Sequence, residues 1–272
     1  MQQGCIASGI LREWQTEGGH MSGRRYCVRQ RAGPLVKECR ALRPRLSRDD
    51  SPYERAEKNK ILRPPRDSSV RCGPVDRLEL YLALFGYDGW SYDLTFGDEY
   101  LPDTFRGVRK LWERMLYRMR KRHPEPIDYV YLIEGLHGDH RYHIHLTVRY
   151  SDFPPIIMED LWPYGYVSGA PLLCLGRDPY DTYRRTAKYY CKERTDGIKI
   201  PVGVQPWVAS RSLRAKLPPP ERFLAESCEI DIPQDCRVYG RNQVDNAFGH
   251  YAYGWWIEEN PLHPTKPKNS AK

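Results

Sequence analysis

The sequence predicts an α+β fold, an antiparallel β-sheet with packed helices, preceded by a largely disordered basic arm. Three observations predict it. The first 75 residues are rich in Arg and Pro and lack sustained apolar periodicity. From Leu78 onward, strand-like and helix-like segments follow in the order strand–helix–strand–strand–helix. A short, polar, Gly-containing loop joins the second and third strands, as in an antiparallel hairpin.

The N-terminal arm carries the whole formal excess of positive charge. The chain has 272 residues and a net charge of +8, and residues 1–75 hold 16 Lys and Arg against 8 Asp and Glu. We expect residues 1–77 to be a basic, mostly disordered arm, with one short helix at residues 53–62. An Arg-rich arm commonly holds nucleic acid, because each neutralised phosphate releases counterions. A merely soluble tail is the alternative interpretation.

The first ordered segments are a strand and a long helix. Residues 90–96, WSYDLTF, are rich in aromatic and β-branched side chains and predict a strand. Residues 101–122 predict an amphipathic helix that ends near Pro124. Its apolar side chains recur at helical spacing: Phe105, Val108, Trp112, Met115 and Met119.

Further strands and a second helix follow along the chain. Residues 128–134 (DYVYLIE) and 141–150 (RYHIHLTVRY) predict paired strands, and residues 164–169 predict a short one. An Asp-Pro pair starts a helix over residues 178–194. Two more strands are predicted near the C-terminus, at residues 237–243 and 249–259. We therefore expect residues 78–257 to form one domain with a C-terminal extension, and residues 258–272 to form a disordered tail.

The composition also bears on location. No run approaches 18 apolar residues, and the N-terminus has no basic region followed by an apolar core. The eight cysteines contain no C-x-x-C spacing, which favours reduced thiols over disulfides or structural zinc. We expect a cytoplasmic protein without membrane contact.

Two histidines in the third strand are candidate metal ligands. Because side chains of a strand alternate between faces, Ile144, Leu146 and Val148 point to a core, and His143 and His145 share the other face. Successive residues on one face lie about 7 Å apart at the backbone, so the two imidazoles can converge on one ion. The alternative interpretation is that the two histidines are simply exposed residues of an alternating strand and have no function.

Glu134 is the third candidate ligand, because it ends the preceding strand. It shares the face of the histidines only if it pairs with Arg141, His143 or His145, since a one-residue slip would turn it away. The loop histidines, His137 and His140, are interpreted as substrate contacts or bystanders. A rival interpretation takes His145-Leu146-Thr147 as half of a two-histidine phosphoesterase. The only second match, His20-Met21-Ser22, has no strand character.

The helix around residues 186–193 carries a tyrosine doublet. Tyr190 falls on the stripe expected to face the sheet, and Tyr189 is turned about 100° away. Lys192 lies one turn beyond Tyr189, so a phenol oxygen and an ammonium can flank one phosphate. Tyrosines that pack in the core, next to a lysine exposed to solvent, would give the same pattern. The functional interpretation therefore requires that this helix lie beside the strand that carries the histidines.

Together these segments resemble the HUH endonuclease superfamily, and more narrowly the rolling-circle replication-associated (Rep) proteins of phages and plasmids. The three motifs of that family are matched in order by DLTF at residues 93–96, by His-hydrophobic-His at residues 143–145 with Glu134 upstream, and by Tyr-x-x-Lys at Tyr189 and Lys192. The resemblance covers roughly residues 80–220. The doublet also allows Tyr190 as the nucleophile. No G-x-x-x-x-G-K-[ST] helicase motif occurs in the sequence.

The resemblance implies a replication initiator that nicks and rejoins single-stranded DNA through a 5′-phosphotyrosine. It implies Mg²⁺ or Mn²⁺ on His143, His145 and Glu134, with Tyr189 as the nucleophile and Lys192 beside the phosphate. Arg141 and Arg149, on the same strand face, are candidate contacts to the DNA backbone. The implied partners are a single-stranded origin and the helicase and polymerase of a bacterial host. A non-enzymatic single-stranded-DNA-binding protein, and a relaxase or transposase with the same chemistry, are the alternatives.

Overall fold

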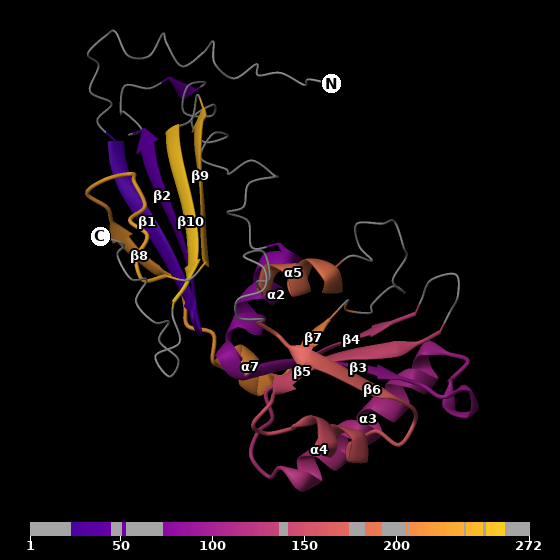
Figure 1. Cartoon of the computed structure of the whole chain (residues 1–272). Coiled ribbons are helices and arrows are strands. Elements are labelled where there is room, and N and C mark those ends of the chain that lie inside the picture. Colours follow the sequence, from indigo (N-terminus) through magenta and orange to yellow (C-terminus); the bar gives the residue numbers. More distant parts are fainter. Residues whose placement is uncertain are drawn as a thin grey trace, which may run out of the picture.

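The computed structural model describes residues 23–44, 51–52, 73–135, 141–173, 183–191, 205, 207–236, 238–246 and 249–258. These residues form two antiparallel five-stranded sheets and five α-helices, so the fold is α+β as predicted. The first sheet, called sheet B, has the strand order β6-β3-β5-β4-β7 (Figure 1). Its strands are β3 (Gly89–Thr95), β4 (Val130–Glu134), β5 (His143–Arg149), β6 (Val167–Pro171) and β7 (Val208–Ala209).

Two helices cover one face of sheet B. The predicted long helix is α3 (Phe105–Arg122), and the Thr104 side chain caps it by accepting a hydrogen bond from the Gly107 amide. Its apolar stripe packs with α4 (Pro155–Leu161) against the even-numbered side chains of β5. That face holds one hydrophobic core, which includes Trp112, Trp162 and Ile144.

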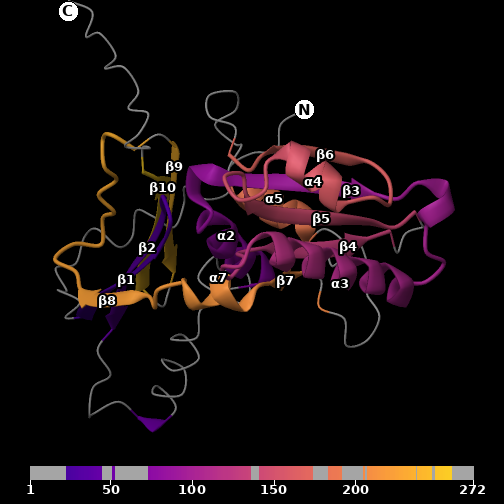
Figure 2. The same ribbon diagram turned by 90° about the horizontal axis from the view of Figure 1, so that it is seen from below.

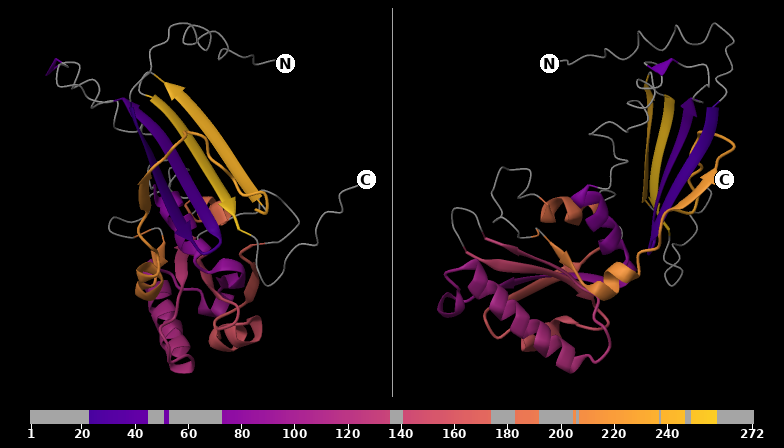
Figure 3. Two further views of the ribbon diagram at one scale, coloured as in Figure 1. Left: turned by 90° about the vertical axis from the view of Figure 1, so that its left-hand side faces the viewer. Right: turned by 180° about the vertical axis from the view of Figure 1, so that it is seen from behind.

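The opposite face of sheet B is covered by α2 (Pro74–Ala83) and α5 (Tyr183–Tyr190), which lie side by side (Figure 3). A second core forms there from Leu78, Leu82 and Tyr183. The odd-numbered side chains of β5, among them both candidate histidines, point into this layer. Sheet B therefore separates a core under α3 from a mixed layer under α5.

The second sheet, called sheet A, corrects the prediction for the N-terminal arm. Residues 23–44 form a β-hairpin, whereas we predicted disorder over residues 1–77. The order is β8-β1-β2-β10-β9 (Figure 2). The strands are β1 (Gly23–Ala32), β2 (Leu35–Pro44), β8 (Glu221–Leu224), β9 (Val238–Asn246) and β10 (Gly249–Ile257).

The charged residues of the hairpin whose side chains the structure describes form ion pairs within the protein, which explains why composition misled the prediction. Glu38 is buried and bonds to the guanidinium groups of both Arg29, at 2.7 Å, and Arg40, at 2.5 Å. The turn needs Gly33, whose φ of +53° is left-handed, and a Cβ there would collide with the Ala83 carbonyl oxygen. Strand pairing and buried ion pairs thus replace the solvation that an Arg-rich segment normally requires.

The predicted C-terminal strands join the hairpin and not sheet B. Trp256 of β10 pairs with Val36 of β2, so the two ends of the described chain build one sheet. Lys37 of β2 and Arg184 of α5 both contact the carboxylates of Asp76 and Glu79 on α2, which ties sheet A to the helices. The domain expected at residues 78–257 is therefore incomplete without residues 23–44.

Some predictions fall outside the described residues, namely the helix at residues 53–62 and most of the predicted tail, residues 259–272. Glu258, the first residue of that tail, is ordered and forms an ion pair with Arg31 at 2.7 Å. The five cysteines in the described ranges are Cys27, Cys39, Cys191, Cys228 and Cys236, and none forms a disulfide. Within the same ranges, no helix combines the length and apolar character needed to cross a bilayer.

Candidate metal centre and nucleophile

The strand register brings the three predicted metal ligands to one face of sheet B. Glu134 of β4 pairs directly with His143 of β5, and Leu132 pairs with His145. This is one of the registers in which the carboxylate lies beside the imidazoles, because directly paired residues point to the same side. Glu134, His143 and His145 thus form a cluster whose ligand atoms all lie within 4.8 Å of one another.

The spacing of these ligand atoms fits a small divalent cation. Oε2 of Glu134 lies 2.6 Å from Nε2 of His145 and 3.2 Å from Nε2 of His143, and the two ring nitrogens are 3.2 Å apart. Two ligands at right angles on an octahedral ion with bonds of about 2.1 Å lie about 3 Å apart. Two imidazoles and one carboxylate also leave coordination positions open for a substrate oxygen. The residues therefore fit the Mg²⁺ or Mn²⁺ implied by the resemblance.

A second carboxylate orients the buried histidine. Asp93 of β3 pairs with His145 across the strands, and its Oδ1 contacts Nδ1 of that imidazole. A ring whose Nδ1 is held by a carboxylate presents Nε2 to a metal in one tautomer and orientation. Sequence analysis placed Asp93 only in the DLTF motif and missed this contact. The period-2 alternation of β3 was a usable signal, but the register between β3 and β5 is set by tertiary structure.

The charges of the cluster are strongly coupled. Burial alone lowers the pKa of His145, but the hydrogen bonds to Asp93 and Glu134 raise it to about 9. Hydrogen bonds from His143 and His145 hold the pKa of the Glu134 carboxyl well below its usual range. The carboxylate is therefore ionised at neutral pH, as a metal ligand must be.

We expect Asp93→Asn to weaken divalent-ion binding by about 10- to 100-fold, the usual cost of losing a partner that orients a ligating histidine. The fold should survive, because the Asp93 side chain is half exposed. Calorimetric titration with Mn²⁺ measures the effect. Asp98→Asn is the matched control, since Asp98 pairs with Arg141 near the same end of the sheet. An unchanged affinity for Mn²⁺ in Asp93→Asn would contradict the orienting role.

The tyrosine doublet divides into a buried and an exposed member. The Tyr190 hydroxyl hydrogen-bonds with Ser91 at 2.7 Å and with Thr147 at 3.2 Å, both on sheet B. Burial raises the pKa of Tyr190 to about 12, despite the opposing effect of those hydrogen bonds. Tyr190 is therefore a packing residue that fastens α5 to the sheet.

Tyr189 lies at the candidate metal centre and is 49% exposed. Its ring centroid is 5.4 Å from that of His145, and the two rings are nearly perpendicular, at 86°. The ring centroid of Tyr190 is also 5.4 Å from that of His145, so exposure and not distance distinguishes the two phenols. Of the two, Tyr189 is the one open to solvent.

The remaining predicted site residues have mixed outcomes. Lys192, His137 and His140 lie outside the described residues. Arg141 lies next to His143 at the strand start, where its guanidinium donates to the Phe96 carbonyl at 2.9 Å and pairs with Asp98 at 2.7 Å. Its side chain is half exposed, and the DNA contact stays a prediction.

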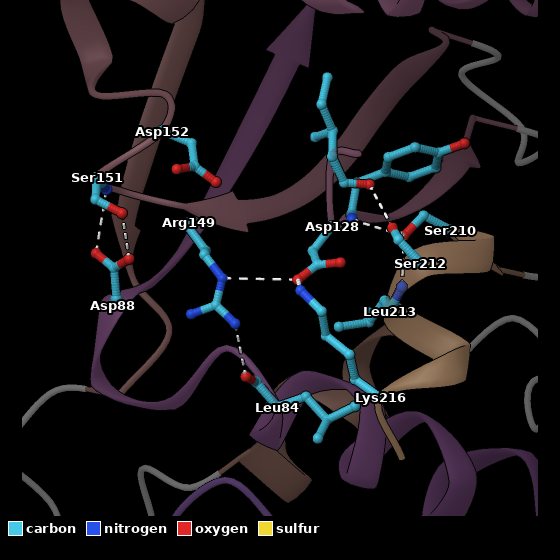
Figure 4. A network of polar contacts seen from close by, with 12 residues as sticks. Leu84, Asp88, Asp128, Arg149, Ser151, Asp152, Ser210, Ser212, Leu213 and Lys216 are labelled. Carbon is cyan, nitrogen blue, oxygen red and sulfur yellow. Dashed lines mark hydrogen bonds and ion pairs between the residues drawn. The ribbon is translucent and has the colours of Figure 1, made fainter. Parts of the chain in front are cut away.

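Arg149, the other candidate DNA contact, has partners inside the protein, and its contact with DNA stays a prediction. Its guanidinium donates to the Leu84 carbonyl at 3.2 Å and lies 3.7 Å from the buried Asp128 carboxylate (Figure 4). Lys216 of α7 (Arg211–Ala215 and its C-cap) bonds to the same carboxylate at 2.5 Å. A buried carboxylate needs such cations, so Arg149 is used to hold the start of β4 in place. Its position on the histidine face could not reveal these internal partners.

Comparison of the chain with protein-family models, curated proteins and solved structures found no match.

Proposed function

We propose that the protein is a metal-dependent tyrosine DNA endonuclease and strand transferase that nicks and rejoins single-stranded DNA. The observation that carries the proposal is the position of the exposed Tyr189 ring, 5.4 Å from the ring of His145 within the Glu134–His143–His145 cluster. A nucleophile and a cation site so close can act on the same phosphate. The donor set alone does not select this chemistry, because other metal enzymes also use two histidines and one carboxylate.

Glu134, His143 and His145 would hold Mg²⁺ or Mn²⁺, which when bound supplies Lewis-acid polarisation of a phosphoryl oxygen and orients the phosphate. The Tyr189 phenol oxygen then forms a bond to phosphorus, and the bond from phosphorus to the 3′ oxygen of the preceding nucleotide breaks. The phenol loses its proton and the released 3′ oxygen gains one. The products are a 5′-phosphotyrosine and a free 3′-OH.

The choice of tyrosine has a thermodynamic reason. One phosphodiester is exchanged for another, so the covalent intermediate keeps enough free energy for a later 3′-OH to reseal the strand. Lys192 is still predicted to steady the phosphate or the phenolate, and Arg141 to hold the DNA backbone. This chemistry suits an initiator of rolling-circle replication in the cytoplasm of a bacterial host, with the host helicase and polymerase as partners. A relaxase or transposase would share the chemistry and differ in DNA target.

The test is to incubate the full-length protein with a labelled library of single-stranded oligonucleotides and Mn²⁺. We expect a band that survives denaturation, runs with the protein and disappears with EDTA, because the adduct is covalent and its formation needs the metal. Sequencing the captured strands then identifies the nick site. Salt-sensitive binding without any adduct, whichever divalent ion is added, would contradict the proposal and favour the non-enzymatic binding protein.

A further inference from the structure

The outward face of α3 concentrates positive charge on one exposed helix. Its 18 residues contain eight Arg and Lys and a single acid, Glu113, which gives a net charge of +7. Residues 76–272 hold equal numbers of acidic and basic residues, so the positive charge of α3 is concentrated locally in a segment that is neutral as a whole. Seven of the eight cations are exposed: Arg106, Arg109, Lys110, Arg114, Arg120, Lys121 and Arg122.

Most of these cations have no counter-charge among the residues that the structure describes. Arg109 pairs with Glu113 at 3.2 Å, and Arg122 pairs with Asp160 at 2.8 Å. The other exposed cations have no ion pair or hydrogen bond with any part of the chain that the structure describes: Arg106, Lys110, Arg114, Arg120 and Lys121. Like charges three or four residues apart destabilise a helix, so this face carries a cost that nothing in the described fold offsets.

Two cations on the other side of the sheet are neutralised within the fold. On α2 and α5, Asp76 and Glu79 neutralise Lys37 and Arg184 within the fold. Exposed cations without an ion pair among the described residues also occur on α2 and α7, but α3 gathers five of them on one helix. An external polyanion would satisfy all five free cations at once.

The polyanion fits nucleic acid better than a membrane surface. A helix that lies in a bilayer needs an exposed apolar face, but the apolar stripe of α3, including Trp112 and Met115, is buried against sheet B. The only exposed large hydrophobic side chain on the helix is Tyr117, at 67%. One aromatic side chain among many cations is also poor for base stacking, which single-strand binding uses. Cations with few aromatics favour contact with the sugar–phosphate backbone.

The position of α3 fits a role beside the candidate metal centre. Thr95 at the end of β3 pairs with His143, and α3 begins ten residues later at Phe105, toward the same end of sheet B. The helix lies on the opposite side of the sheet from α5 (Figure 3). Eighteen residues at 1.5 Å span about 27 Å, comparable to eight base pairs of duplex DNA. DNA held at Tyr189 could pass around this end of the sheet and continue along α3.

We propose that the outward face of α3 binds the sugar–phosphate backbone of duplex DNA. Binding itself requires no chemistry at Tyr189. The interpretation of this duplex as the segment flanking the nicked strand rests on the proposed function. The sequence-based prediction assigned nucleic-acid binding to the N-terminal arm and to the strand arginines, whereas this surface lies on a helix that was predicted only for its packing.

The test compares two charge-matched variants of the full-length protein. In the α3 variant, Arg106→Gln, Lys110→Gln and Arg114→Gln remove three free cations; glutamine keeps a good helix propensity. The matched control is Arg77→Gln with Arg211→Gln and Arg214→Gln, which removes three exposed arginines of α2 and α7. Fluorescence anisotropy with a 20-base-pair duplex, over a series of salt concentrations, gives the affinity.

We expect the α3 variant to bind the duplex at least tenfold more weakly, and the slope of log K against log salt to fall by about 2.7, or 0.9 per lost phosphate contact. The control should change affinity by less than twofold. Equal losses in both variants would overturn the proposal, as would unchanged duplex binding. If the α3 variant does not fold, as circular dichroism would show, Arg120→Gln with Lys121→Gln tests the other end of the helix, with an expected slope change of about 1.8.

Two further measurements separate this inference from its rivals. Adduct formation on a short single strand should be unaffected in the α3 variant, so loss of the adduct and loss of duplex binding report on the two proposals independently. Loss of single-strand affinity with unchanged duplex affinity would overturn the choice of duplex. Binding to phosphatidylserine vesicles without binding to duplex DNA would assign the surface to a membrane and overturn the proposal.

Discussion

Tyr189→Phe should abolish the covalent adduct with single-stranded DNA, lowering its rate of formation by about a thousandfold or more, because the attacking oxygen itself is removed. The ring remains, so the contact with His145 and the packing of α5 are preserved. DNA binding should be unchanged within about twofold. The measurements are the denaturation-resistant band on a labelled oligonucleotide with Mn²⁺, and anisotropy for binding.

Tyr190→Phe is the matched control for this prediction. It removes one hydroxyl from the neighbouring residue, but that hydroxyl bonds with Ser91 and Thr147. Loss of a buried hydrogen-bonded group costs about 1–3 kcal/mol, so we expect lower thermal stability with the adduct retained. An adduct that persists in Tyr189→Phe and is lost in Tyr190→Phe would transfer the nucleophile to the buried residue and contradict the assignment made from exposure.

The double variant His143→Ala with His145→Ala should lose divalent-ion binding and metal-dependent cleavage together. Two of three protein ligands disappear, and loss of a single orienting partner already costs about 10- to 100-fold in affinity, so the dissociation constant for Mn²⁺ should rise by more than 100-fold. Calorimetric titration measures the affinity, and the oligonucleotide assay measures cleavage. Thermal unfolding monitored by circular dichroism verifies that the sheet remains folded.

His123→Ala serves as the control for general loss of a histidine, because His123 caps the far end of α3 and contacts Asp152. It should leave both Mn²⁺ affinity and cleavage unchanged. Glu134→Gln removes the charged ligand and retains the shape of the side chain, and it should reproduce most of the metal loss. Cleavage that continues unchanged in the double variant would refute the metal assignment.

The elements of sheet B could be predicted because their patterns are local. Alternation in β5 predicted that Ile144 packs inward while His143 and His145 share the other face, and the structure places them so. The helical spacing of Trp112 and Met115 predicted α3 in the same way. The sequence could not predict whether Glu134 pairs with His143, because the register between strands depends on the loop and on packing. It predicted only that Glu134 would share the face of the histidines in certain registers.

The features that sequence analysis missed are non-local. Residues 23–44 have the composition of a disordered arm, and only burial of Glu38 between Arg29 and Arg40 and pairing with β10 make them a sheet. Asp93 contacts His145, which is 52 residues away in the sequence. Arg149 contacts Asp128, 21 residues away, and the Leu84 carbonyl, 65 residues away. A window along the sequence carries no information about such partners, because their meeting depends on the completed fold.

The arrangement of sheet A has a consequence during synthesis on the ribosome. β1 and β2 are translated before β8 and β10, which pair with the two outer edges of the hairpin. Until then the nascent hairpin presents unpaired strand edges, which are sites of misassociation between chains. Its ion pairs with α2 allow it to dock early, so the interval of exposure depends on how quickly residues 221–257 are synthesised.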